Sequence, residues 1–180
     1  MSINEIAFFL NGGDSNDVLN KEYGVPFWNS TFEDSEKCKK RGLPPNNLGP
    51  ASYGPVLHDF PTRDGGTFNQ MQAIVEQIRE LPHLKTHVAT TLYPPEIFRG
   101  EGKIQKVVTV PCHGTLIEFR ILDGKLNLTM VQRSGDILPA AGNHNKIQYA
   151  AFLLMMAKVT SYVPDTFSHV IVDPHIYENH

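Results

Sequence analysis

Asp123-Gly124 lies between two segments of strand-like residues, and this arrangement constrains the fold more than any other feature of the chain. Asp-Gly is typical of a two-residue turn whose central residues both have positive φ, which suits the twist of a β-hairpin. In the second segment, Leu126 and the residues that alternate with it are apolar, as in a strand with one buried face. We therefore predict a hairpin with strands over 115–122 and 125–132.

Other segments supply the helices and the rest of a sheet. In residues 69–81 the apolar side chains recur at the spacing of one helix face. Residues 146–160 are apolar nearly all round, which predicts a long buried central helix. Further strands are predicted over 88–92, 104–110 and 169–172, where β-branched residues are frequent. Together these elements predict an α+β fold, in which a twisted mixed or antiparallel sheet packs against helices.

The composition is that of an ordinary globular protein. Of the 180 residues, 41% are hydrophobic and 19% are charged, and we expect a single domain over 1–180. The net charge of -3 argues against a nucleic-acid partner held by a broad basic surface. No apolar run is long enough for a signal peptide or a membrane span. Because the two cysteines, Cys38 and Cys112, lie in unlike contexts, we expect reduced thiols and a cytoplasmic protein with no membrane partner.

The residues that carry chemistry flank the predicted hairpin. Cys112 follows Pro111 before the first strand, and Arg133 and Ser134 follow the second. A guanidinium beside a thiol favours the nucleophilic thiolate, and an arginine followed by a hydroxyl residue suits a phosphate. The alternative interpretations are a buried core cysteine and a surface ion pair. Taken together, the residues favour an enzyme that acts on an anionic substrate.

Two further groups of polar residues are candidates for substrate binding. Asn145 lies at the start of the predicted helix 146–160, where capping is the default role. Its amide can also pair with both a donor and an acceptor on a pyrimidine edge. Asp173, His175 and Tyr177 follow the last predicted strand, where they either bind a sugar or form a polar loop.

In their order along the chain, these residues resemble the folate-dependent thymidylate synthases. The resemblance runs from Glu5 to His180. Its motifs are Glu5, Gly13-Asp14-Ser15-Asn16, Trp28, Leu48-Gly49-Pro50 before Tyr53-Gly54, Pro111-Cys112-His113, Gln132-Arg133-Ser134-x-Asp136, Asn145-x-x-x-Tyr149 and Asp173-x-His175-x-Tyr177-x-Asn179-His180. It implies transfer of a one-carbon unit from 5,10-methylenetetrahydrofolate to C5 of a pyrimidine nucleoside monophosphate. The leading prediction is dUMP to dTMP, by a homodimer that needs no metal.

The resemblance also implies a role for each matching residue. Cys112 is expected to add to C6 of the pyrimidine, because C5 becomes nucleophilic only after such an addition. Arg133 and Ser134 are expected to bind the phosphate, and Asn145 to read the N3 and O4 edge of uracil. Glu5, His113 and Tyr53 are expected to organise water and proton transfer. His175 and Tyr177 are expected to hold the sugar hydroxyl. Asp136 is expected to face the folate together with Trp28, and it also belongs to the catalytic set.

The chain departs from the family pattern at several places. Lys85-Thr86 stands where the family has a pair of phosphate-binding arginines, and Thr31 stands near the place of a second tryptophan. Residues 137–144 form a longer and more polar loop than the family's turn over the folate. We also expect the chain to lack the family's N-terminal and C-terminal segments. Two alternatives therefore stay open: a 5-hydroxymethylase of CMP, dCMP or dUMP, in which water ends the reaction, and an inactive truncated homologue.

Overall fold

The computed structural model describes residues 1–34 and 36–178, and these form two compact units. The first unit is built mainly from residues 3–69 and 91–111, and the second from residues 70–90 and from Cys112 onward. Helices and strands are both present in quantity, so the α+β prediction is confirmed. Among the described residues, no helix combines the length and apolar surface that a bilayer crossing requires.

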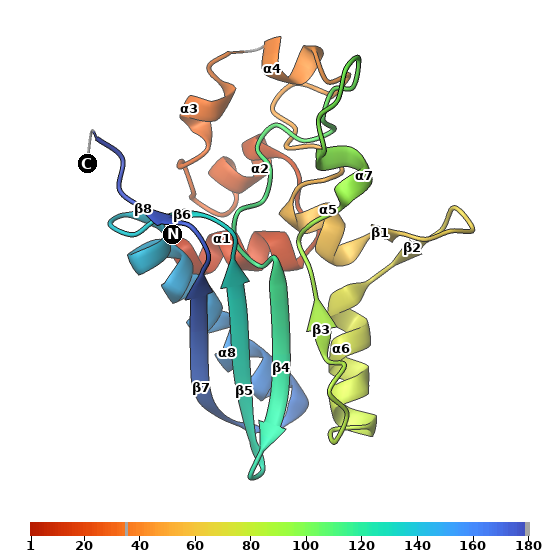
Figure 1. Cartoon of the computed structure of the whole chain (residues 1–180), viewed down its shortest axis with the longest axis vertical. Coiled ribbons are helices and arrows are strands. Elements are labelled where there is room, and N and C mark those ends of the chain that lie inside the picture. The colour runs from red at the N-terminus through yellow and green to blue at the C-terminus, as the bar shows by residue number, and fades with distance from the viewer. Residues whose placement is uncertain (35, 179–180) are drawn as a thin grey trace. The chain divides into compact units, whose positions relative to one another are not determined.

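A four-stranded sheet forms the centre of the second unit. In spatial order its strands are β3 (Val88–Ala89), β4 (Leu116–Leu122), β5 (Lys125–Gln132) and β7 (Val163–Ile171). β4 is antiparallel to both of its neighbours, whereas β7 runs parallel to β5 (Figure 1). The sheet is therefore mixed. Since β5 and β7 are parallel, their carboxyl ends lie at the same edge of the sheet, which is where several predicted site residues follow.

The hairpin of β4 and β5 forms at the predicted residues. Leu122 pairs with Lys125 across the turn, and Asp123 and Gly124 have φ values of 50° and 73°. Both values lie in the left-handed region that a type I′ turn requires. One face of β5 is buried, and its members Leu126, Leu128, Met130 and Gln132 are at most 1% exposed.

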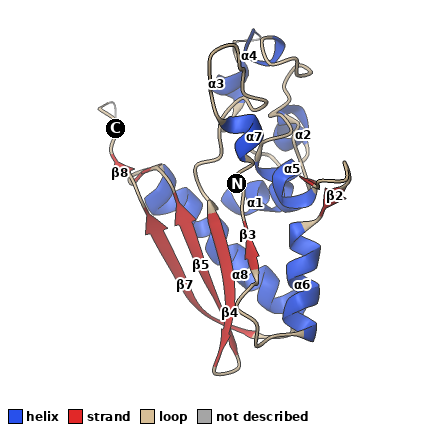
Figure 2. Cartoon of the chain, turned by 45° about the vertical axis from the view of Figure 1, so that its right-hand side comes forward, coloured by secondary structure: helices blue, strands red, loops and turns tan. Residues whose placement is uncertain are grey.

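The helix α8 (Lys146–Thr160) begins and ends at the predicted residues. It lies across one face of the sheet (Figure 2). The ring of Phe152 meets that of Phe119 on β4 edge to face, with centroids 5.3 Å apart. On the other side of the helix, Leu154 and Val159 are 59% and 44% exposed. The sheet thus covers one side of α8, and its burial is less complete than its all-round apolar composition predicts.

A second helix, α6 (Gln70–Glu80), falls within the predicted 69–81. Its buried face consists of Met71, Ile74 and Ile78. At its start, the Gln70 amide pairs with the backbone of Thr90, just beyond β3. Nε2 donates to the Thr90 carbonyl and Oε1 accepts from the Thr90 N–H, each at 3.0 Å. A single side chain therefore ties the helix to the short edge strand.

Of the three further strand predictions, one fails and two have other bounds, since the strand predicted over 88–92 is β3 and ends at Ala89. Residues 104–110, all of which the structure describes, form no strand. Their backbone pairs with a neighbouring loop instead, since the N–H of Val108 donates to the carbonyl of Leu48 at 2.9 Å. The last strand, predicted over 169–172, is β7 and begins at Val163. Composition identified β-branched segments correctly, but it did not determine which of them pair in a ladder.

The first unit is mainly helical. Its elements are α1 (Ser2–Leu10), α2 (Asn16–Lys21), α3 (Asn29–Phe32), α4 (Glu36–Lys39), α5 (Tyr53–His58), β1 (Phe60–Pro61), β2 (Thr67–Phe68) and α7 (Pro94–Ile97). Its core is Phe8, Phe9, Leu19, Val25, Leu48 and Tyr53, each at most 3% exposed. Glu5 lies one turn before Phe8 and Phe9 on α1, so the helix carries this carboxylate on its buried face.

Candidate active site

Cys112 lies half-buried before β4, and the end of β5 returns beside it. The carbonyl of Cys112 accepts a hydrogen bond from the backbone N–H of Arg133 at 2.9 Å. The hairpin thus brings the candidate nucleophile and the candidate phosphate ligand together. Arg133 itself is exposed to solvent.

The residue after Cys112 forms a buried pair with α8. Nδ1 of His113 lies 3.0 Å from the hydroxyl oxygen of Tyr149, and the two residues are 4% and 0% exposed. Burial raises the pKa of Tyr149 far above its ordinary value, and negative charge on Cys112 raises it further. Tyr149 therefore keeps its proton at physiological pH, and its hydroxyl group can donate a hydrogen bond to the imidazole.

The loops after β5 and β7 pair with each other at the carboxyl edge of the sheet. The two short strands β6 (Gly135–Asp136) and β8 (Pro174–His175) are parallel. Beside them, Oγ of Ser134 donates to Oδ2 of Asp173 at 3.1 Å. This pairing gathers a predicted phosphate ligand, a predicted folate contact and a predicted sugar ligand in one part of the second unit.

The predicted sugar ligands lie next to each other. Nδ1 of His175 is 3.2 Å from the carbonyl of Asp173, and its ring meets that of Tyr177 with centroids 4.9 Å apart. Tyr177 is 56% exposed, so this end of the site is open to solvent. The motif continues to Asn179-His180, which lies outside the described residues.

The divergent loop 137–144 starts from a buried carboxylate. Asp136 is 4% exposed, and its Oδ1 accepts the backbone N–H of Leu138 at 3.0 Å. The loop ends in a π-helical turn, η1 (Ala140–Asn145), which runs directly into α8. Wide turns of this kind are rare in proteins, but those that do occur are often found at functional sites. Here the turn delivers Asn145 to the start of the buried helix.

Asn145 does not cap α8 with its side chain, which was its default interpretation. Its Oδ1 accepts from Nε2 of Gln132 at 3.0 Å, and its Nδ2 donates to Oε1 of Gln148 at 3.0 Å. Gln132 also donates to the carbonyl of Ser134 at 3.1 Å, and its Oε1 lies 2.9 Å from Nε2 of His169. The amide is therefore one link in a hydrogen-bonded chain.

The first unit contains the other predicted residues. The indole Nε1 of Trp28 donates to Oε1 of Glu5 at 2.5 Å. Tyr53 stacks on Phe9 with ring centroids 4.7 Å apart and meets the Trp28 ring edge to face at 6.4 Å. An aromatic core thus holds both the carboxylate of Glu5, which is 4% exposed, and the phenol of Tyr53, which is 3% exposed.

The predicted site residues therefore form two groups, each coherent within its unit. The first unit holds Glu5, Trp28 and Tyr53, and the second holds Cys112, His113, Arg133, Ser134, Asp136, Asn145, His175 and Tyr177. Sequence reasoning missed Gln148 and His169 as neighbours of this site. A glutamine three residues after Asn145 on an apolar helix was the available signal for Gln148, whereas His169 had none beyond its place in a strand.

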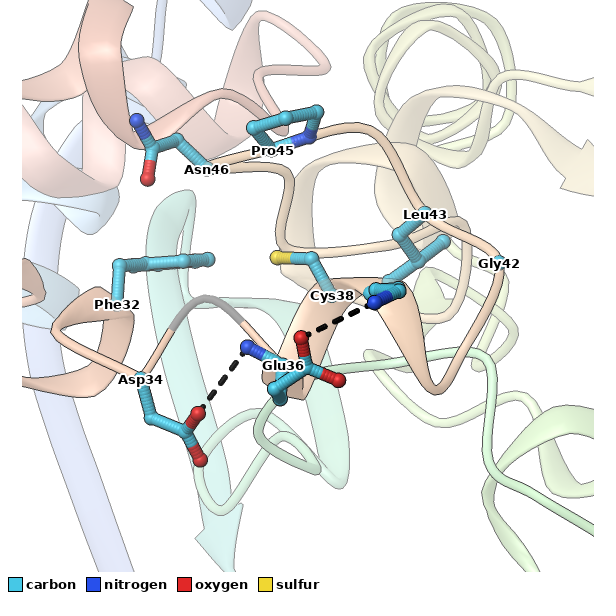
Figure 3. A pocket seen from close by; sticks show the side chains of 9 residues that line it. Phe32, Asp34, Glu36, Cys38, Gly42, Leu43, Pro45 and Asn46 are labelled. Carbon is cyan, nitrogen blue, oxygen red and sulfur yellow. Dashed lines mark hydrogen bonds and ion pairs between the residues drawn. The ribbon is translucent and has the colours of Figure 1, made fainter.

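A separate cavity of about 480 Å³ lies in the first unit beside α4 (Figure 3). Phe32, Leu43 and Pro45 give it apolar walls. The Cys38 thiol faces it and donates to the carbonyl of Asn47 at 3.6 Å. None of the predicted site residues lines this cavity, and its thiol is engaged with the backbone.

Among residues 1–34 and 36–178, no group of three or more His, Cys, Asp or Glu side chains is placed to hold a metal ion. In a comparison with known families, the model of the family described as thymidylate synthase matches residues 1–180. This match contains every motif on which the two groups of residues depend.

Proposed function

Since the chain belongs to the thymidylate synthase family, whose members transfer a one-carbon unit from methylenetetrahydrofolate to C5 of a pyrimidine, we propose that it converts dUMP to dTMP. The observation that carries this proposal is the placement of Cys112 against Arg133, whose backbones are joined at 2.9 Å. A nucleotide whose phosphate binds Arg133 would present its base to the adjacent thiol. Such positioning is what converts a weak nucleophile into an effective one.

In the proposed reaction, the Cys112 thiolate forms a bond to C6 of the base, and the electron pair of the C5–C6 bond moves toward O4. C5 is then nucleophilic, which it is not in the free base. Methylenetetrahydrofolate would supply the one-carbon unit to C5, and loss of the C5 proton would then break the bond between that unit and tetrahydrofolate, leaving an exocyclic methylene group. A hydride from tetrahydrofolate, which would leave as dihydrofolate, would complete the methyl group as the bond between Cys112 and C6 breaks and the thiolate is restored.

Five residues are assigned to binding of the nucleotide. Arg133 and Ser134 bind the phosphate, as a guanidinium beside a hydroxyl is suited to do. Asn145 reads the base, and His175 with Tyr177 holds the sugar hydroxyl. These five residues belong to the second unit.

The remaining assignments concern protons, water and the folate. Glu5 and Tyr53 move protons at O4 and C5, and the Trp28 indole at 2.5 Å holds the carboxylate of Glu5 in one position. His113, paired with Tyr149, orders water near the thiol. Trp28 and Asp136 face the folate, and Asp136 belongs to the catalytic set as well.

The loop 137–144 favours a second candidate, a 5-hydroxymethylase. Ile137 and Leu138 are 39% and 52% exposed, and η1 widens the turn that follows them. A more open and polar loop would admit water to the one-carbon unit on C5. Water would then add where hydride adds in a thymidylate synthase, and the product would carry a hydroxymethyl group.

We also propose that the protein is a homodimer. The long strand β7 exposes the apolar side chains Val163 and Val170, at 62% and 48%. Exposed apolar groups of this kind are frequent at interfaces between copies of a chain. Light scattering after gel filtration gives the mass directly, and a monomer at micromolar concentration would contradict this assignment.

The deciding experiment is mass spectrometry of the products formed from methylenetetrahydrofolate with dUMP, UMP, dCMP or CMP in parallel. Methylated dUMP, lost in Cys112→Ser, is the expected result. A hydroxymethylated nucleotide would establish the second candidate and identify its substrate. Absence of any product would overturn both and indicate a homologue that does not turn over.

A further inference from the structure

We propose that Gln148 and His169 are positioning residues that lock the Asn145 carboxamide in one orientation, and that this orientation decides which pyrimidine base is accepted. The inference rests on the proposed role of Asn145 as the base reader. It assigns a function to Gln148 and His169, which are not among the residues that define the sequence motifs. The hydrogen bonds that orient Asn145 begin at one fixed acceptor.

The fixed acceptor is the backbone carbonyl of Ser134, which cannot donate. Nε2 of Gln132 lies 3.1 Å from it, so this end of the Gln132 amide must be the NH2 group. Gly135 leaves room for this contact, because a Cβ at that position would lie 2.5 Å from Nε2. The sense of the Gln132 amide is therefore set by the backbone.

His169 holds the opposite end of the Gln132 amide. Oε1 of Gln132 lies 2.9 Å from Nε2 of His169, so the ring nitrogen must carry the hydrogen and donate it. Burial lowers the pKa of His169, and the nearby charge of Lys146 lowers it further. The ring is thus neutral at physiological pH, with its hydrogen on Nε2.

Asn145 receives its orientation from both sides. The second hydrogen on Nε2 of Gln132 points to Oδ1 of Asn145 at 3.0 Å. On the other side, Nδ2 of Asn145 donates to Oε1 of Gln148 at 3.0 Å. Gln148 is fully buried, so water does not replace it as acceptor. Turning the Asn145 amide over would set oxygen against oxygen and NH2 against NH2.

An amide held in this way has one acceptor site and one donor hydrogen left for a base. Uracil presents the N3 hydrogen and the O4 oxygen, whereas cytosine presents the N3 lone pair and the N4 hydrogens. The two bases require opposite orientations of the same amide. A locked amide therefore fits one of them, and an amide that turns over freely fits both.

The test compares dUMP and dCMP binding by calorimetry in matched variants. Gln148→Leu and His169→Phe remove one link each, and we expect the ratio of the two dissociation constants to fall about tenfold. Gln148→Glu keeps an acceptor for Nδ2 and should restore most of the ratio. Phe167→Leu changes the ring that stacks on His169 at 5.9 Å and serves as the packing control. If Gln148→Leu and His169→Phe both keep the wild-type ratio of dissociation constants, the proposed role of these residues is wrong.

A second readout needs no nucleotide. The side-chain NH2 resonances of Asn145 should be one slowly exchanging pair in the wild type and should broaden in Gln148→Leu. Equal behaviour in the two proteins would also overturn the lock. If the wild type binds neither nucleotide, the proposed function fails together with the base choice, while the resonances still decide whether the amide is held.

Discussion

The hydroxyl of Tyr149 lies 3.0 Å from Nδ1 of His113, immediately after the candidate nucleophile Cys112 in the chain. This contact joins the segment before β4 to the central helix α8. Both partners are buried, so neither can exchange its bond for one with water. The contact therefore fixes the backbone that carries Cys112 as well as the imidazole beside it.

Replacing Tyr149 by phenylalanine should destabilise the protein. The ring still fills its space, but His113 keeps a buried nitrogen without its partner, which lowers the free energy of unfolding by about 1 to 3 kcal/mol. Urea unfolding followed by circular dichroism measures the change. Tyr162→Phe, on a half-buried tyrosine just beyond α8, is the control and should have little effect. Equal changes in the two variants would show that the contact is unimportant.

Trp28→Phe should slow turnover without weakening nucleotide binding. The variant keeps an aromatic ring but removes the Nε1 donor that lies 2.5 Å from Oε1 of Glu5. A carboxylate that loses its orientation is a poorer proton-transfer group, so kcat should fall about tenfold while the Kd for dUMP is unchanged. Tyr23→Phe changes another ring that packs on the same core. An unchanged kcat, or a fall matched by Tyr23→Phe, would contradict this role.

Arg133→Lys should weaken nucleotide binding while leaving the fold intact. The backbone bond to Cys112 persists, but a point charge replaces the planar fork that binds phosphate through two hydrogen bonds. We expect the Kd for dUMP to rise about tenfold to a hundredfold in calorimetry. Arg120→Lys, in which the altered residue pairs with Glu118 on β4, should bind as the wild type does. Unchanged affinity in Arg133→Lys would exclude it as the phosphate ligand.

Stability should decrease in mild acid because His87 is buried. Burial lowers the pKa of His87, so the folded protein resists protonation while the unfolded chain accepts a proton near the ordinary value of about 6.5. The contribution of His87 to stability is thus complete above that pH and is lost as the pH falls below it. His87→Leu should reduce the pH dependence of the unfolding midpoint between pH 8 and 5, and part of it should remain because burial also lowers the pKa of His169. His83→Leu, at an exposed position, should not reduce this pH dependence.

The two thiols should react at different rates. Cys38 is 3% exposed and donates to the carbonyl of Asn47, whereas Cys112 is half-buried. Iodoacetamide should therefore label Cys112 first, and bound dUMP should slow this labelling, as peptide mass spectrometry can measure. Cys38→Ser should leave the rate at Cys112 unchanged. Faster labelling of Cys38, or no protection by dUMP, would argue against Cys112 as the nucleophile.

The elements that local sequence determines were predicted well. The β4–β5 hairpin follows from Asp123-Gly124, because few other residue pairs adopt positive φ twice in succession. The bounds of α8 follow from an apolar run with no glycine or proline inside it. In both cases the information lies within a few residues of the element itself.

The contacts that could not be predicted from the sequence depend on how strands far apart in the chain pair with each other. His169 enters the amide network only because β7 runs parallel to β5 with Met130 opposite it, and no local pattern sets that pairing. Gln148 lies in a segment that is otherwise mostly apolar, so the segment was interpreted as a buried helix and this polar residue was not singled out. Residues 104–110 have the composition of a strand but pair with a loop. The candidate site residues follow from the order and spacing of the motifs, whereas the side chains that bond to Asn145 and Gln132 depend on the tertiary fold.

The parallel pairing of β5 and β7 also has a consequence for how the protein is made. Ser134 leaves the ribosome well before its partner Asp173, because α8 and the whole of β7 lie between them in the chain. The hairpin that ends at Arg133 can form early from local contacts, while the edge that joins β6 to β8 must wait for the last strand. A nascent chain therefore presents Cys112 before Ser134 has its partner Asp173, and this part of the candidate site is complete only after β8 has been synthesised.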